Sequence, residues 1–210
     1  LLACDNNKDA YVWDVVTGEM LTRISDLDDV EKIDFVGDTM LTYYNNDGKI
    51  KVIDFCNDEV IVEDDSEYVY AVKGEQYGKY VAFLEDDKIN VYDITTKKNI
   101  YRIECEKDKK FSTNIIWCED KLICAEEHVE DSNEEQNITN IKVIDIKSGD
   151  IIETSGDFYT IDGVKIEGGN MFILSHRFED KKGIGIIFAI EENSGQVIWT
   201  NEYEGVIIKK

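Results

Sequence analysis

The chain has 210 residues, of which 23 are Lys or Arg and 46 are Asp or Glu, so its formal net charge is −23. Proteins that bind nucleic acid neutralise phosphates with clustered Lys and Arg, and this excess of carboxylates excludes nucleic acid as an expected partner. No apolar run approaches the roughly 18 residues of a membrane-spanning helix, so we expect a soluble segment without membrane insertion.

The predicted elements, in chain order, are short strands separated by turn residues. Residues 10–14 and 19–24 are the second and third of three strands in the first repeat, and a turn ending at Gly18 joins them. Four further repeats each contain four strands: 31–36, 39–44, 50–55 and a fourth; 68–72, 80–84, 89–94 and 100–105; 113–118, 121–125, 141–146 and 151–154; and 163–167, 171–176, 184–190 and 197–203.

One five-residue pattern, apolar-mixed-Val-apolar-Asp, recurs in the third strand of these repeats. It occupies 10–14, 50–54, 89–93 and 141–145, and residues 187–191 keep its apolar positions but end in Glu. The acids Asp14, Asp54, Asp93, Asp145 and Glu191 are therefore 40, 39, 52 and 46 residues apart. Four-stranded units with a period near forty are typical of propeller blades. The predicted fold class is an all-β propeller of four-stranded antiparallel blades, with about five blade units.

The residues after each repeated acid predict a tight turn. Gly18, Gly149 and Gly195 take the position where a positive φ closes the hairpin. Repeats two and three have Asp58 and Lys97 at that place, so we expect their turns to differ. We interpret the repeated acids as caps of the turns that follow them, which is a structural role.

The segment Tyr11–Glu19, with its Trp13-Asp14 pair, resembles the third strand and turn of a WD40 repeat. The last repeat, with Ala189, Glu191, Ser194, Gly195 and Trp199, resembles the related PQQ-like (quinoprotein-type) propeller repeat. The chain has one Trp-Asp pair and no Gly-His dipeptide, so the hydrogen-bonded tetrad of WD40 blades does not carry over. What the resemblance implies is the blade, and a binding platform as the general role.

The repeats divide the chain into units at roughly 1–27, 28–66, 67–108, 109–157 and 158–205, with 206–210 starting or completing a blade. They form one propeller domain, which is either a closed ring of five blades or a stretch of a larger propeller. Since the first residue is Leu1 rather than Met, we expect a piece of a longer protein.

The sequence contains no constellation that predicts catalysis, a cofactor or a metal ion. His128 and His176 lie in different repeats without ligand residues at metal spacing, and no phosphate-binding or nucleophile motif occurs. Five cysteines without a CxxC pair predict neither a zinc site nor a disulfide framework, which favours reduced thiols and a cytoplasmic location. The sequon at Asn137 is the opposing sign, since it would matter in a secreted chain.

An acidic run at 126–136 separates two strands of the fourth repeat and predicts a solvated loop. A docking loop for a basic partner and a calcium site are the alternatives, although the spacing of an EF-hand is absent. The candidate interaction residues in this run are Glu126, Glu127, Glu130, Asp131, Glu134 and Glu135.

Three functions follow from this reading. The favoured one is a non-catalytic scaffold that binds another protein, with basic partners favoured by the charge. The alternative is an extracellular or envelope PQQ-like propeller that binds a ligand or assembles with membrane proteins. A propeller enzyme is the third, and no residue pattern supports it.

Overall fold

The computed structural model describes residues 2–4, 9–25, 27, 30–45, 49–57, 59–65, 69, 71–75, 77–85, 87–112, 115–128, 138–158, 160–179 and 182–204. These residues form 20 strands in five sheets, and neighbouring strands run antiparallel. The predicted all-β class is confirmed, and three of the sheets have four strands. None of the described sheets closes on itself, and the ring of five blades stays a prediction. The described residues contain no helix long and apolar enough to cross a membrane.

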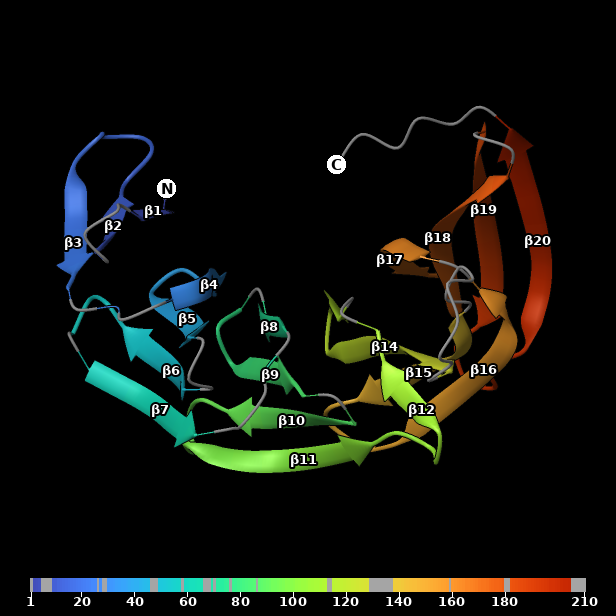
Figure 1. The fold of residues 1–210 in the computed structure, drawn as a ribbon, viewed down its shortest axis with the longest axis horizontal. Coiled ribbons are helices and arrows are strands. Elements are labelled where there is room, and N and C mark those ends of the chain that lie inside the picture. Colours follow the sequence, from blue (N-terminus) through green and yellow to red (C-terminus); the bar gives the residue numbers. More distant parts are fainter. Residues whose placement is uncertain are drawn as a thin grey trace. The chain divides into compact units, whose positions relative to one another are not determined.

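The chain divides into two compact units, and the first covers Leu1–Ile103. It holds three sheets, whose ribbons Figure 1 draws from blue to green. They consist of β1 (Leu2–Cys4), β2 (Ala10–Trp13) and β3 (Met20–Ile24); β4 (Val30–Val36), β5 (Met40–Asn45), β6 (Lys49–Asp54) and β7 (Glu59–Asp65); and β8 (Ala71–Gly74), β9 (Tyr80–Leu84), β10 (Lys88–Asp93) and β11 (Lys98–Glu104).

The second and third sheets of this unit pack face to face over a shared apolar core. Because side chains alternate along a strand, each sheet sends one set of aliphatic residues to this interface. The core contains Val36, Ile50, Val52, Val62, Val72, Val81 and Phe83. The backbones also approach closely, since a Cβ at Gly74 would lie 2.4 Å from the carbonyl oxygen of Phe35. Only glycine fits at that contact.

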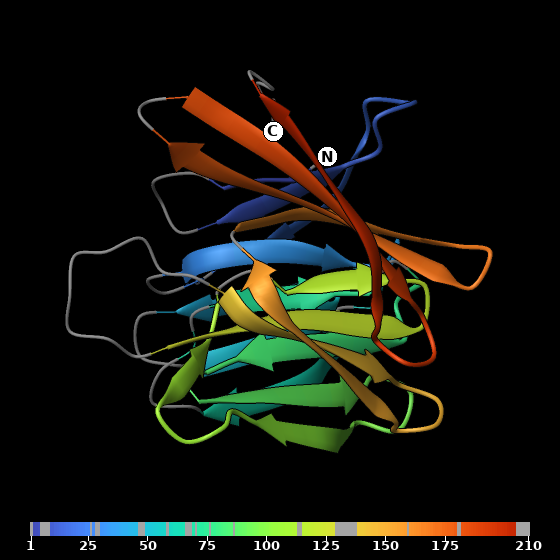
Figure 2. The ribbon, with the colours of Figure 1, turned by 90° about the vertical axis from the view of Figure 1, so that its right-hand side faces the viewer.

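The second unit covers Glu104–Lys210 and holds two sheets. The first is built from β12 (Lys109–Phe111), β13 (Ile116–Cys118), β14 (Lys121–His128), β15 (Ile138–Asp145) and β16 (Ile151–Phe158). The second is built from β17 (Thr160–Glu167), β18 (Asn170–Glu179), β19 (Lys182–Glu191) and β20 (Val197–Glu204). Figure 2 shows the long strands β18 to β20 twisting together.

These two sheets also share a core. The sheet of β14 and β15 contributes one apolar face and the sheet of β18 and β19 contributes the other: Ile123, Ala125, Ile141, Val143, Ile173, Ile186, Phe188 and Ile190. Burying each such side chain contributes about 1.5–3 kcal/mol. Thr154 closes the interface at one end by donating its hydroxyl to the carbonyl oxygen of Gly195 at 2.8 Å.

The fourth sheet differs from its prediction on one side. Its predicted first strand, 113–118, is replaced by two pieces, β12 and β13, which both pair with β14. The strand predicted at 121–125 continues to His128, and its partner begins at Ile138 rather than Ile141. The added length includes charged residues, which the sequence pattern assigns to a loop.

Candidate functional site

The four repeated aspartates lie at strand ends and hydrogen-bond to the backbone of the turns that follow. A carboxylate oxygen of each accepts N–H groups two or three residues ahead, over 2.7–3.2 Å: Val16 and Thr17 for Asp14, Cys56 and Asn57 for Asp54, Thr96 for Asp93, and Lys147 and Ser148 for Asp145. The bonds from Thr17 and Val16 hold the pKa of Asp14 below its usual value. Each aspartate therefore caps the turn that directly follows it, as the sequence predicts.

The turns also share a left-handed residue. Gly18, Gly149 and Gly195 have φ of 74°, 81° and 71°, and each donates its N–H to the carbonyl of the repeated acid four residues earlier. Lys97 takes the same region with φ of 56°, so the prediction that its turn differs is wrong in backbone conformation. Asp58 lies outside the described residues. In the last turn the Glu191 carboxylate accepts the hydroxyl of Ser194 at 2.5 Å.

A second hydrogen bond recurs at the same end of four sheets. Each repeated acid ends one strand, and the residue after the acid donates its N–H to a carbonyl oxygen in the neighbouring hairpin. The acceptor is the residue just before the strand that pairs with the strand of the acid. The distances are 2.9–3.1 Å: Phe55 to Thr39, Ile94 to Lys79, Ile146 to Asp120, and Glu192 to Gly169. The same register places Met40, Tyr80, Lys121 and Asn170 opposite the acids Asp54, Asp93, Asp145 and Glu191. Lys121 is the one cation among these four partners.

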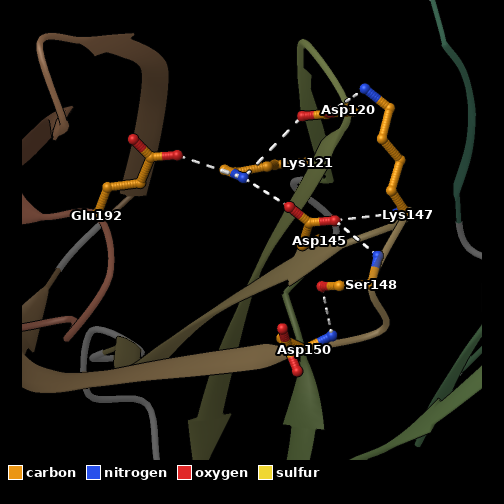
Figure 3. A network of polar contacts seen from close by, with 7 residues as sticks. All are labelled: Asp120, Lys121, Asp145, Lys147, Ser148, Asp150 and Glu192. Carbon is orange, nitrogen blue, oxygen red and sulfur yellow. Dashed lines mark hydrogen bonds and ion pairs between the residues drawn. The ribbon is translucent and has the colours of Figure 1, made fainter.

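Lys121 is the centre of a polar network that Figure 3 shows from close by. Its Nζ lies 2.8 Å from Asp145 Oδ2, 3.3 Å from Glu192 Oε1 and 4.0 Å from Asp120 Oδ1. Lys147 Nζ pairs with Asp120 Oδ2 at 2.6 Å. Glu192 comes from the turn between β19 and β20, so this network joins the two sheets of the second unit.

These contacts favour the charged forms of Asp145 and Lys121. Hydrogen bonds from Lys121 and from the backbone of Ser148 and Lys147 lower the pKa of Asp145 to about 2. Desolvation lowers the pKa of Lys121, but the bonds to Asp145 and Glu192 outweigh it and the net shift is upward. A lysine with a raised pKa stays protonated at neutral pH and is not a nucleophile or a general base. The role of the network is therefore structural, because its ion pairs link neighbouring turns.

Glu126 has a different place from the predicted one. It lies in β14 rather than in a loop, and none of its surface is exposed. Its Oε1 is 2.6 Å from Nζ of Lys142 on β15, and its Oε2 accepts a hydrogen bond from Asn140 at 3.3 Å. Lys109 lies 3.8 Å from Oε2. The predicted solvated position is wrong because paired charges can be buried where an isolated one cannot.

Glu127 is also in β14 and buried, and its Oε1 pairs with Lys110 Nζ at 3.3 Å. The sequence signal for this arrangement is the pair Lys109-Lys110 before the apolar Phe111, which offers cations to the two acids across the strand pair. The other candidate loop residues, Glu130, Asp131, Glu134 and Glu135, lie outside the described residues.

The tryptophans of the repeat pattern lie in different settings. Trp13, on β2, stacks on Tyr11 with ring centroids 5.7 Å apart. Trp199, on β20, lies beside Phe172 with ring centroids 6.2 Å apart and keeps 42% of its surface exposed.

Among the described residues, the remaining reactive groups form no second cluster. His176 Nδ1 lies 2.6 Å from Asp162 Oδ2. Burial raises the pKa of Cys124, which makes its thiol unreactive. Among the residues that the structure describes, no disulfide joins Cys56, Cys105, Cys118 and Cys124, and no three His, Cys, Asp or Glu side chains gather in a metal-binding group.

Apart from Val15, Val16 and Tyr77, which lie in turns, the exposed large apolar side chains of the described residues lie on outermost strands of the sheets. Val60 on β7, Ile100 on β11 and Ile151 on β16 are single examples, and β3 has Met20 and Leu21. The strand β20 has four: Val197, Ile198, Trp199 and Tyr203. Trp and Tyr are the residues that dominate binding hot spots, so these strands are the candidate binding surface.

Comparison with one solved structure, BamB, supports this architecture. The chain aligns with BamB from Moraxella catarrhalis at a TM-score of 0.60 and 12% identity, over 95% of this chain and 57% of BamB. The fold is of the β-propeller type. A computationally designed protein, Ika8, aligns at a TM-score of 0.49 and 13% identity, over 95% of this chain and 83% of Ika8. This chain thus spans little more than half the length of BamB. No protein-family model and no curated protein matches the sequence.

Proposed function

We propose that this propeller-type chain is a non-catalytic scaffold that binds another protein. The observation that carries the proposal is the concentration of exposed apolar side chains on outermost strands, above all the four on β20. Exposed aromatic and aliphatic side chains on a rigid sheet can be buried by a partner at little cost in ordering. The polar clusters, in contrast, are compensated within the fold, as Lys121 and Lys142 show.

The charge of −23 specifies the kind of partner. A chain with this charge attracts basic surfaces, and salt weakens such attraction. We therefore expect a basic partner, and a cytoplasmic location is part of the proposal because no disulfide joins the described cysteines. We also propose that the blades are related to those of WD40 proteins, which Tyr11–Glu19 resembles.

The experiment is a pull-down from the native lysate with the purified chain as bait, repeated from low to high ionic strength. We expect one or more proteins to be retained at low salt and released as salt rises. Retention of no protein at any ionic strength would overturn the proposal, and copurification of a small molecule or a metal ion at stoichiometric occupancy would then favour a ligand-binding function.

The second candidate is a PQQ-like propeller of the envelope that binds a ligand or assembles with membrane proteins. The resemblance of the last repeat to PQQ-like repeats and the fold likeness to BamB favour it. Thiol titration of the unreduced, denatured chain separates the two, because five thiols fit a reducing compartment and one thiol fits two disulfides formed in an oxidising one.

A further inference from the structure

The outermost strand β20 differs from the strands that take the same place in other sheets. Val60, Ile100 and Ile151 are the single exposed large apolar residues described on β7, β11 and β16, and β3 has two, Met20 and Leu21, whereas β20 has four. Since all of these strands are outermost in their sheets, that position alone does not account for the apolar surface of β20. The difference indicates a use specific to β20.

Among the described strands, the outer edge of β20 has no paired strand, and the first part of β20 carries no charge. Among the described strands, β20 has one neighbour, β19, and the run from Val197 to Asn201 contains no charged residue. Proteins usually protect such edges with Lys, Pro or a bulge. Here a bulge lies at Ile198, because Val197 pairs with Ile190 and Trp199 with Ala189. From Trp199 to Glu204 the pairing with β19 is regular, so no bulge interrupts the edge of this segment.

The two faces of this regular segment have different chemistry. Because side chains alternate, Trp199, Asn201 and Tyr203 lie on one face, and Thr200, Glu202 and Glu204 lie on the other. Trp199 and Tyr203 are 42% and 47% exposed. An arginine of β18, Arg177, pairs with Glu202 at 3.2 Å and neutralises part of the acidic face.

We propose that Trp199–Glu204 is a strand-addition site for an extended segment of a partner protein in which apolar side chains alternate with Lys or Arg. This inference rests on the proposed function and specifies its partner. Backbone hydrogen bonds to the open edge of β20 would hold the segment in register. Its apolar side chains would contact Trp199 and Tyr203 as cross-strand neighbours, and its cations would face Glu202 and Glu204.

A second copy of this chain is the wrong occupant on electrostatic grounds. Antiparallel pairing of two β20 strands about Tyr203 would place Glu202 of each strand opposite Glu204 of the other. It would also bring together two chains that each carry −23. Like charges opposite one another destabilise a strand pair, so a basic segment is the matching partner.

The test uses a synthetic eight-residue peptide of alternating Val and Lys with capped ends. Its control is the same peptide N-methylated at every residue, which removes the hydrogen-bond donors along both edges. We expect the unmodified peptide to slow amide hydrogen exchange in residues 197–204 and to change the tryptophan fluorescence. The N-methylated peptide should bind at least tenfold more weakly. Equal binding of both peptides, or protection of another strand instead, would overturn the proposal.

Matched variants complete the test. Trp199→Lys and Tyr203→Lys should each weaken binding of the peptide at least tenfold, since each removes an aromatic anchor. Ile151→Lys is the control, because Ile151 is 49% exposed and also lies on an outermost strand, and its affinity should stay at the wild-type value. Far-UV circular dichroism checks the fold of each variant. Wild-type affinity in both β20 variants, or an equal loss in the control, would contradict the site.

The pull-down separates the two proposals. If Trp199→Lys retains the same native partner as the wild type, the strand-addition site is wrong and the scaffold function stands. If neither chain retains a protein, both proposals fail.

Discussion

The fourth sheet contains two lysine-centred networks that differ in burial. Lys142 and Glu126 lie within β15 and β14 with side chains 7% and 0% exposed, whereas Lys121, Asp145 and Glu192 lie at the turn end with 14%, 27% and 24% exposed. Both lysines have raised pKa values, because the bonds to carboxylates outweigh desolvation. The contacts are similar, but water can replace a lost partner only at the turn end. Burial, rather than distance, should therefore decide what each network contributes.

The largest expected effect comes from breaking the buried pair. Lys142→Met leaves the Glu126 carboxylate without its cation at 2.6 Å and should reduce the free energy of unfolding by about 3–5 kcal/mol. Urea unfolding followed by tryptophan fluorescence measures it. The double variant Glu126→Leu with Lys142→Met should recover most of the loss, because an apolar pair needs no compensation. A single variant as stable as the wild type would show that burial is not the deciding factor.

The next largest effect tests how much the close backbone contact at Gly195 stabilises the turn end of the sheets, compared with the charges there. A Cβ at Gly195 would lie 2.8 Å from the carbonyl oxygen of Glu153, so Gly195→Ala should cost about 2–4 kcal/mol from overpacking and the left-handed φ. Gly18 has a similar φ, 74° against 71°, but nothing lies within 4 Å of its Cβ position. Gly18→Ala should therefore cost only about 1 kcal/mol, and equal unfolding midpoints for the two variants would refute the close contact.

Removing the central cation of the turn network should have a modest effect. Lys121→Met breaks contacts to three carboxylates, yet solvent screens them, so we expect a loss of about 1 kcal/mol. Unfolding at low and high salt distinguishes the two networks. The loss in Lys121→Met should shrink as salt rises, and the loss in Lys142→Met should not. A salt response of the same size in both variants would contradict the comparison.

The smallest effect is a pH dependence from Asp145. Its pKa falls from 3.8 to about 2 on folding, so its charged form favours the folded state above about pH 4, and this contribution is lost as pH falls towards 2. Asp145→Asn should cost under about 1 kcal/mol at pH 7, and its difference from the wild type should narrow between pH 4 and pH 2. Urea unfolding across this range measures it, with Asp38→Asn in another sheet as the control.

The repeat was readable in the sequence because its signals are local. An aspartate at each strand end and a turn residue four positions later predict a hairpin, and β2, β6, β10, β15 and β19 end at or just before the expected acids. The turn at Lys97 was predicted to differ because glycine was taken as the determinant. The bond from Thr96 N–H to Asp93 indicates that the acid also determines this turn.

The candidate site was harder to predict because its contacts join residues distant in the sequence. Lys121 meets Glu192 only when two sheets pack, and no periodic pattern marks that pair. Glu126 was assigned to a loop because hydropathy weighs each charge alone, whereas the fold buries it with Lys142 and Asn140. The exposure of Trp199 depends likewise on what packs against β20.

The recurring bond from Phe55, Ile94, Ile146 and Glu192 ties the two hairpins of four sheets together at the turn end. The connection between the two hairpins leaves from the opposite end of the strands. Residues inserted into that connection would leave the hydrogen-bonded turns at the other end unchanged. The widest spacing of the repeated acids, from Asp93 to Asp145, includes the acidic segment between β14 and β15 at that end. For protein engineering, this connection is accordingly the place to graft a foreign binding sequence into a blade.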